Sequence, residues 1–261
     1  MKIYTYYQNI NHDRQPELID LWKISWSRQG YEPIVLNLED AKRHPYFDTL
    51  NTEMRRIFKE ITNNEISEYG MSCWFRWLAY ATQADEKFYV SDYDAINVNF
   101  PITEPSNTLH LMDAHVPCFA SGTPTQFKNL CKAFVDVSNQ RIDILKSQAN
   151  HYHDQEFFDY NREELKNHHN IVMTRDRDKL LSPYIKDHLT PIIHFSHFRC
   201  KTNSNRIKLI KSDVDNLIFR KYDLIISNPP YIKKFDLNKL NREVIDYEPK
   251  MALDGGLEGL S

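Results

Sequence analysis

Short apolar segments alternate with longer amphipathic segments along residues 1–90, and this alternation restricts the possible folds more than any other feature of the chain. Residues 2–7 alternate as in a strand, and residues 16–29 place Leu18, Leu21 and Trp22 at helical spacing before a stop at Gly30. The same reasoning predicts strands at 34–36 and 88–90 and helices at 45–61 and 71–83. Strands that alternate with helices form a parallel or mixed sheet covered on both faces, so we expect an α/β fold.

Further strands and helices are predicted as far as residue 195. Apolar segments predict strands at 109–112, 118–120 and 191–195, and helical spacing predicts helices at 125–137 and 140–149. No internal repeat or low-complexity tract interrupts this part. We therefore expect residues 1–200 to form one α/β domain and residues 201–261 to form a separate segment.

Size, charge and cysteine content exclude several classes of protein. The 261 residues carry a net charge of −3; residues 201–261 hold eleven Lys/Arg against nine Asp/Glu (+2), and residues 1–200 hold the other 22 against 27 (−5). Neither region has the basic surplus of a protein that binds the phosphate backbone, so charge argues against nucleic acid. No apolar run is long enough to span a membrane and no signal peptide begins the chain, so a cytoplasmic location is expected. The four cysteines, Cys73, Cys118, Cys131 and Cys200, form no metal-binding or paired spacing, which predicts free thiols.

Two carboxylates follow the predicted strand at 88–90. Asp92 and Asp94 flank one residue in Ser91-Asp92-Tyr93-Asp94. The carboxyl ends of strands are where open α/β sheets bind ligands, and two such oxygens could share one hard divalent cation. The spacing therefore favours a metal site here, against the alternative of an ordinary Asp-rich turn.

The DXD arrangement and its surroundings resemble those of the GT-A class of nucleotide-sugar glycosyltransferases. The resemblance also covers the helical segment 73–80, which contains Arg76, and the opening pattern of residues 21–41. It implies a GT-A-like, Rossmann-like mixed sheet with helices on both faces. It further implies a nucleotide-sugar donor whose diphosphate is held by Mn²⁺ or Mg²⁺ at Asp92 and Asp94.

The same resemblance suggests roles for other residues, and each has an alternative. Arg76 could brace the donor phosphates, or could make an ion pair with a nearby acid. His194 lies where some GT-A families place a third metal ligand, but could equally be a packing residue. Ser121 and Gly122 are expected in an acceptor-side loop, and either Asp113 or Asp154 could act as a general base.

A different motif lies near the C-terminus. The apolar run Leu224-Ile225-Ile226 leads into Asn228-Pro229-Pro230-Tyr231, which reads as a buried strand followed by a rigid turn with free carbonyl groups. This motif, with residues 246–259, resembles the HemK/PrmC release-factor glutamine methyltransferases, which use S-adenosylmethionine; the resemblance covers roughly residues 205–261. It implies that Asn228 and the following carbonyl accept hydrogen bonds from the substrate amide, that Tyr231 packs on the amide, and that Asp213 lies near the cofactor. The same four residues occur in DNA adenine methyltransferases, where a flipped base takes the place of the amide.

The glycines of the chain conflict with this second resemblance. Such enzymes hold the cofactor on a glycine-rich turn upstream of the motif, because only glycine lets the backbone approach a ligand so closely. None of the six glycines lies between Gly122 and Gly255. We therefore expect a hybrid chain: a glycosyltransferase-like domain followed by a truncated piece of a Rossmann-like methyltransferase whose S-adenosylmethionine site is incomplete. The alternative is a working N-methyltransferase that acts on a release-factor glutamine or on adenine in nucleic acid.

Overall fold

The structure of the protein is a computed structural model that describes residues 1–10, 15–112, 117–168, 171–173, 181–182 and 191–194. The chain divides into two units, Met1–Ser204 and Asn205–Ser261, and all described residues belong to the first. The methyltransferase-like motif at Asn228–Tyr231 and Asp213 therefore lie outside the described residues, as does Asp113.

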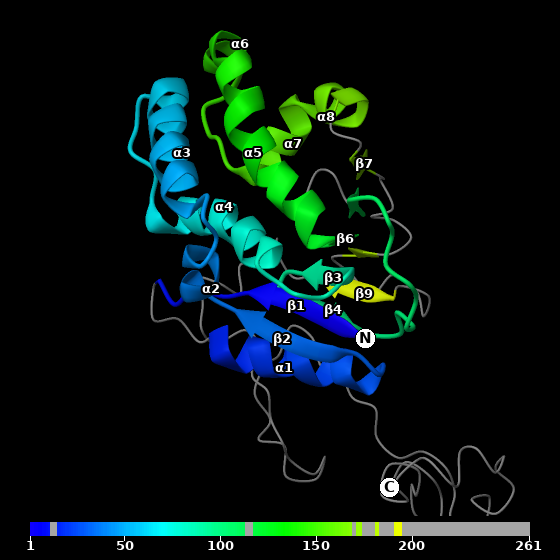
Figure 1. Ribbon diagram of the computed structural model, residues 1–261. Helices are drawn as coiled ribbons and strands as arrows, with labels where there is room; N and C mark the ends of the chain where they lie inside the picture. Colours follow the sequence, from blue (N-terminus) through cyan, green and yellow to red (C-terminus); the bar gives the residue numbers. More distant parts are fainter. Residues whose placement is uncertain (11–14, 113–116, 169–170, 174–180, 183–190, 195–261) are drawn as a thin grey trace, which may run out of the picture. The chain divides into compact units, whose positions relative to one another are not determined.

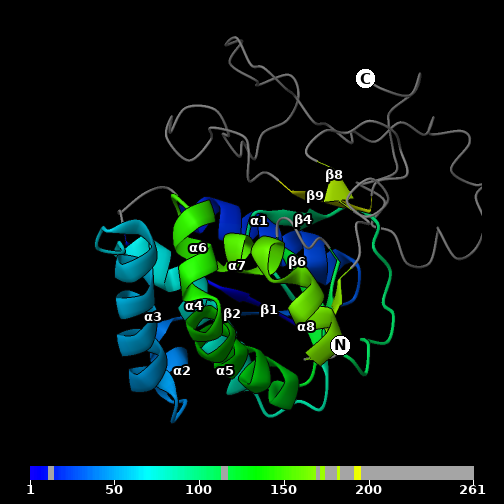
Figure 2. The same ribbon diagram turned by 90° about the horizontal axis from the view of Figure 1, so that it is seen from above.

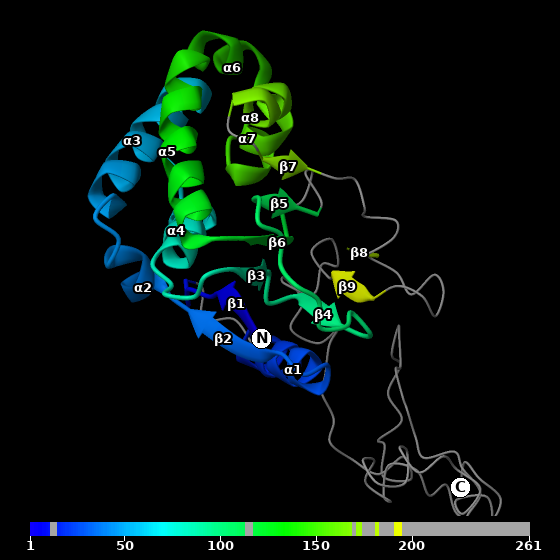
Figure 3. The same cartoon turned by 45° about the vertical axis from the view of Figure 1, so that its right-hand side comes forward.

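A mixed six-stranded sheet forms the centre of the domain, with strand order β2-β1-β3-β6-β5-β7. Its members are β1 (Lys2–Tyr6), β2 (Glu32–Leu36), β3 (Phe88–Ser91), β5 (His110–Leu111), β6 (Phe119–Gly122) and β7 (Val172–Met173). β1 is parallel to β2 and β3, while β6 is antiparallel to β3 and β5. A second sheet has the order β4-β9-β8 and consists of β4 (Ala95–Asn97), β9 (Ile192–His194) and β8 (Leu181–Ser182); Figure 3 shows β4 and β9 beside each other.

Helices cover both faces of the central sheet (Figure 1). Side chains alternate along a strand, so Phe88 and Val90 of β3 enter one core while Tyr89 enters another. The second core contains Trp22 and Trp26 of α1 (Gln15–Arg28). The first core lies under the long helices α3 (Phe47–Thr62), α4 (Glu68–Ala81) and α5 (Pro124–Gln140), which gather side by side in Figure 2. The predicted α/β fold with a mixed sheet and helices on both faces is thus confirmed.

Local signals explain where the helices begin and end. The left-handed backbone at Gly30 (φ 82°) follows α1 and provides the predicted stop. The Ser67 hydroxyl accepts a hydrogen bond from the Gly70 amide (3.1 Å) at the start of α4, and Thr123 and Gln126 form a reciprocal cap at the start of α5. Each predicted helix up to residue 149 is present, with ends shifted by a few residues.

Several elements were not predicted. A short helix, α2 (Leu38–Lys42), precedes α3 because Asn37 and Asp40 form a capping box. Beyond α6 (Ile142–Gln148), the chain forms α7 (Asp154–Tyr160) and α8 (Arg162–His168). Ser121 and Gly122 lie within β6 rather than in the predicted acceptor-side loop, because their backbone pairs with β3. Cys73, Cys118 and Cys131 are thiols, and within the described ranges no helix has the length and hydropathy needed to cross a bilayer.

Candidate functional site

Contacts with two neighbouring elements fix the C-terminal end of β3, which carries both predicted carboxylate ligands. The amide of Asp92 donates a hydrogen bond to the Cys118 carbonyl oxygen (2.8 Å), next to β6. The Trp22 indole of α1 donates to the hydroxyl of Ser91 (2.8 Å). The amide of Ala95 donates to the Asp92 carbonyl oxygen (3.0 Å). These contacts hold Asp92 and Asp94 on one tight turn between β3 and β4.

Strand pairing brings His194 to the same turn. β9 runs antiparallel to β4 with Ala95 opposite His194. The His194 Nε2 atom lies 3.3 Å from Asp94 Oδ1 and 3.7 Å from Asp92 Oδ2. One ligand atom from each of the three residues lies within 4.8 Å of the other two. The structure thus gathers the three residues that the sequence predicts as metal ligands, although His194 follows Asp94 by one hundred residues.

The donor atoms of this cluster suit a divalent cation. Asp94 and His194 are 2% and 6% exposed, whereas the Asp92 side chain is 26% exposed and opens the cluster to solvent. Burial opposes protonation of His194, but the Cys118 thiol and the Asp94 carboxylate outweigh it and raise the pKa of the imidazole well above its usual value. Two carboxylates suit Mn²⁺ or Mg²⁺, so Asp92 and Asp94 fit the predicted metal. The His194 imidazole becomes a ligand only when the cation displaces the proton that its raised pKa favours.

Arg76 of α4 connects this cluster to α7. Its Nη1 atom donates to Asp92 and its Nε atom donates to Asp154 (2.9 Å). The Asp154 carboxylate also accepts from the Trp77 indole (2.8 Å), and only 5% of its side chain is exposed. Burial opposes the charge on Arg76, but Asp154 and Asp92 outweigh that cost and keep the pKa of the guanidinium well above its ordinary value. The ion pair, one of the two alternatives for Arg76, is therefore present, and it orients Asp92.

Asp154, one of the two candidate general bases, is an ion-pair partner of Arg76 in the structure. One of its carboxylate oxygens, Oδ2, accepts hydrogen bonds from both Arg76 and Trp77, and the residue is 3% exposed. A carboxylate held in this way orients its partners. Nothing in the local sequence shows this role, because the two residues pair across 78 positions.

A second group of ligand-type side chains was missed from the sequence. His151, His153 and Glu156 also place one ligand atom each within 4.8 Å of the others. The signal was present as a His-x-His pair followed by an acid, but no role was predicted for it. In the described part of the chain, these two groups are the places where three such side chains converge in this way.

No protein-family model matches the chain. The predicted resemblance to glutamine methyltransferases is confirmed over a short segment. The ribosomal protein uL3 glutamine methyltransferase of Francisella tularensis is 53% identical over 58 residues, which are 22% of this chain and 18% of that protein. The release factor glutamine methyltransferase of Geobacter sulfurreducens is 58% identical over 41 residues, which are 16% of this chain and 14% of that protein. The chain thus spans less than a fifth of the length of these relatives.

Two glycosyltransferases of known structure resemble the chain at low identity. One, involved in the glycosylation of the major capsid of PBCV-1, is 11% identical with a TM-score of 0.38, covering 75% of this chain and 93% of that one. The other, the apo form of GlyE from Streptococcus pneumoniae, is 10% identical with a TM-score of 0.37, covering 67% of this chain and 45% of that one. Likeness at this level assigns no activity.

Proposed function

We propose that residues 1–200 form a metal-dependent glycosyltransferase domain that takes a nucleotide sugar as donor. The observation that carries the proposal is the convergence of Asp92, Asp94 and His194 at the carboxyl end of β3. The resemblance of the DXD segment to the GT-A class supplies the reaction type. Both the position in the sheet and the donor atoms suit a cation that binds a diphosphate.

Asp92, Asp94 and His194 would hold the cation, with Asp92 on the open side of the cluster. A cation held there would supply positive charge to offset that of the diphosphate. Arg76 acts as a positioning residue in this proposal, because it bonds Asp92 from inside the domain. Its guanidinium already pairs with two carboxylates, so the predicted bracing of the donor phosphates stays a prediction.

Two tyrosine rings meet at the turn that carries the aspartates. The Tyr93 ring, between the two aspartates, meets the Tyr7 ring edge-on at 5.7 Å between centroids. Both side chains are half-buried. An aromatic face beside a diphosphate site suits a stacked base, and we propose that this pair borders the nucleoside.

The test is Mn²⁺-dependent hydrolysis of a panel of nucleotide sugars by the full chain. Asp92→Asn should abolish the hydrolysis, whereas Asp143→Asn, the same change at a side chain that is 96% exposed in α6, should leave it intact. Calorimetry with UDP and GDP in the presence of Mn²⁺ reports on binding alone. Absence of binding by any nucleoside diphosphate would refute the proposal.

A second candidate function rests on the identity with glutamine methyltransferases. We propose that residues 201–261 form a partial S-adenosylmethionine-dependent methyltransferase segment that does not transfer methyl groups. The residues of the chain do not fit the cofactor, because no glycine lies between Gly122 and Gly255 to form the close backbone turn that it needs. The alternative is an active N-methyltransferase whose substrate is a glutamine amide of a release factor, or adenine in nucleic acid.

Calorimetry with S-adenosylmethionine separates these alternatives. We expect no heat of binding from the full chain. Micromolar binding, together with methylation of a release factor that Asn228→Ala removes, would establish the active alternative. Methylation of DNA in place of the release factor would show that the substrate is adenine in nucleic acid.

A further inference from the structure

The segment between α6 and α7 presents two histidines on one side. Tyr152 lies between them and is fully buried, with its hydroxyl 2.8 Å from the Ser138 hydroxyl. The backbone at His153 is extended (φ −118°, ψ −170°). In extended backbone, alternate side chains point to the same side, so the buried Tyr152 turns His151 and His153 away from itself, with His151 exposed and His153 half-buried. The anchor in the core thereby fixes the direction of both imidazoles.

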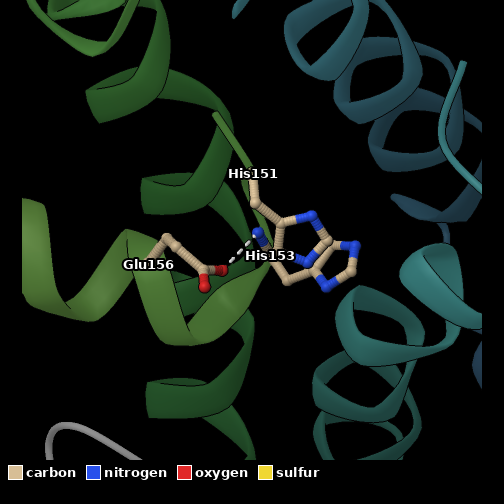
Figure 4. A group of neighbouring side chains, drawn as sticks. All are labelled: His151, His153 and Glu156. Carbon is tan, nitrogen blue, oxygen red and sulfur yellow. Dashed lines mark hydrogen bonds between the residues drawn. The ribbon is translucent and has the colours of Figure 1, made fainter. Parts of the chain in front are cut away.

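Glu156 approaches the two imidazoles from the first turn of α7. Its Oε2 atom accepts a hydrogen bond from the His153 amide (2.8 Å), as Figure 4 shows. A carboxylate has a second oxygen with its own lone pairs, so the cap does not use up the group. The imidazole centroids of His151 and His153 are 3.9 Å apart. Three donors from six consecutive residues therefore converge.

Neighbouring helices hold the His153 ring in place. The Phe58 ring of α3 stacks on it, with centroids 6.0 Å apart and planes inclined by 19°. Gly70 of α4 leaves the space that the ring occupies, because a Cβ atom there would lie 2.6 Å from the His153 Nε2 atom. A ligand held by packing is already oriented before a metal arrives. His151 is exposed, so the cluster is open to solvent on its side.

We propose that His151, His153 and Glu156 form a second metal site, which binds a borderline transition-metal ion of the Zn²⁺ class with solvent as the fourth ligand. Two imidazole nitrogens and one carboxylate are a donor set that zinc prefers, in contrast to the oxygen-rich cluster at Asp92. Tetrahedral ligands at about 2.0–2.2 Å from zinc lie about 3.4 Å from each other. The donors here lie within 4.8 Å of one another, so modest rotations of the His151 and Glu156 side chains would bring them to this spacing.

The position of this site gives the metal a structural consequence. Asp154 follows His153 directly and pairs with Arg76, which in turn bonds Asp92. A metal that fixes the first turn of α7 also fixes the carboxylate of Asp154. The inference does not depend on the glycosyltransferase proposal, because it concerns other residues and another class of metal.

The test uses the full chain without a histidine tag, freed of metal by a chelator, in an Asp94→Asn background that removes the other cluster. Co²⁺ titration should produce the intense visible absorption of a four-coordinate ion, without the near-ultraviolet band that a thiolate ligand would add. His151→Ala should remove the absorption and weaken Zn²⁺ binding by about tenfold or more, because loss of a ligand costs at least as much as loss of its support. Asn150→Ala, at the exposed neighbouring position, should change neither measurement.

Two further measurements distinguish the loss of a metal ligand from the loss of folding. Circular dichroism establishes that His151→Ala is folded, which the exposure of this residue favours. Glu156→Gln retains an oxygen for the helix cap but loses the charged ligand, and should also weaken Zn²⁺ binding. Equal Co²⁺ absorption in the parent and in His151→Ala would overturn the proposal. The weak absorption of a six-coordinate ion in both proteins would also overturn it.

Discussion

The Asp92–Asp94–His194 cluster and the His151–His153–Glu156 cluster have the same number of donors within the same 4.8 Å, yet the chain assembles them in different ways. The first needs the turn after β3 and the pairing of β4 with β9. The second lies within six consecutive residues, whose side chains are aimed by the buried Tyr152 and by the packing of Phe58 and Gly70 against His153. The first is mostly buried and rich in oxygen, and the second is partly exposed and rich in nitrogen. A site built from distant segments therefore depends on the whole fold. A local site depends on its own backbone and on the helices against which it packs.

The largest expected effect is a loss of hydrolysis that leaves metal binding at the histidine cluster unchanged. Asp94→Asn should lower Mn²⁺-dependent hydrolysis of the nucleotide sugar by about 100-fold or more, since it removes one of three ligands. The Co²⁺ absorption of the histidine cluster should persist in this variant. Steady-state kinetics and a Co²⁺ titration on the same preparation check both statements. If both signals disappear together, the clusters are not independent.

A change at Arg76 should affect both clusters through stability. Arg76→Met leaves Asp154 buried without its charged partner, and breaking a buried pair in this way costs about 3–5 kcal/mol. Urea denaturation of the metal-free chain measures the loss.

The matched control for Arg76 is Arg56→Met, which removes an arginine from exposed ion pairs with Glu53 and Glu60 on α3. Exposed pairs contribute about 1 kcal/mol or less, so this variant should remain close to the parent. Equal losses at Arg76 and Arg56 would show that the link between α4 and α7 does not stabilise the domain.

Gly70→Ala should disturb the histidine cluster and the core side chain next to it. The added Cβ atom would lie 2.6 Å from the His153 Nε2 atom and 2.7 Å from the Ile66 Cγ1 atom, so both side chains must move. We expect Zn²⁺ affinity to fall by about tenfold, as for other losses of support around a ligand. Nucleotide-sugar hydrolysis should stay near the parent value. Ser72→Ala, on the same helix, is the control, and unchanged Zn²⁺ affinity in Gly70→Ala would argue against the position of His153.

The smallest effect concerns the imidazole of His44, which belongs to neither cluster. Burial, together with Lys128 and Lys132, lowers the pKa of His44 below its usual value of 6.5. The unfolded chain therefore binds this proton more readily, so the contribution of His44 to stability is full above pH 6.5 and declines as the pH falls below it. His44→Gln should flatten that part of the stability profile, measured by urea denaturation between pH 5 and 7. A steeper profile in the variant would contradict the lowered pKa.

The residues of these sites differ in how far the sequence alone could predict their roles. The strand predicted at 88–90 is present as β3, because a short apolar run is a local pattern. The metal-binding role of Asp92 and Asp94 stays a prediction. His194 was predicted only through a family resemblance, since no local pattern links it to Asp94. The partner in the ion pair of Arg76 could not be predicted, because Asp154 lies 78 residues along the chain. The spacing of His151, His153 and Glu156 can be read from the sequence. It predicts a shared site only once Tyr152 is known to be buried, because the buried ring sets the direction of the two imidazoles.

Steric preferences of the backbone and the periodic placement of apolar side chains act within a few residues, so the alternation of strands and helices and the stop at Gly30 could be read directly from the chain. Which strands pair, which carboxylate meets which guanidinium, and which pKa rises or falls depend on segments brought together from far apart. Those outcomes follow from the packing of the complete domain, because the free energy of a buried charge or imidazole is set by whatever surrounds it.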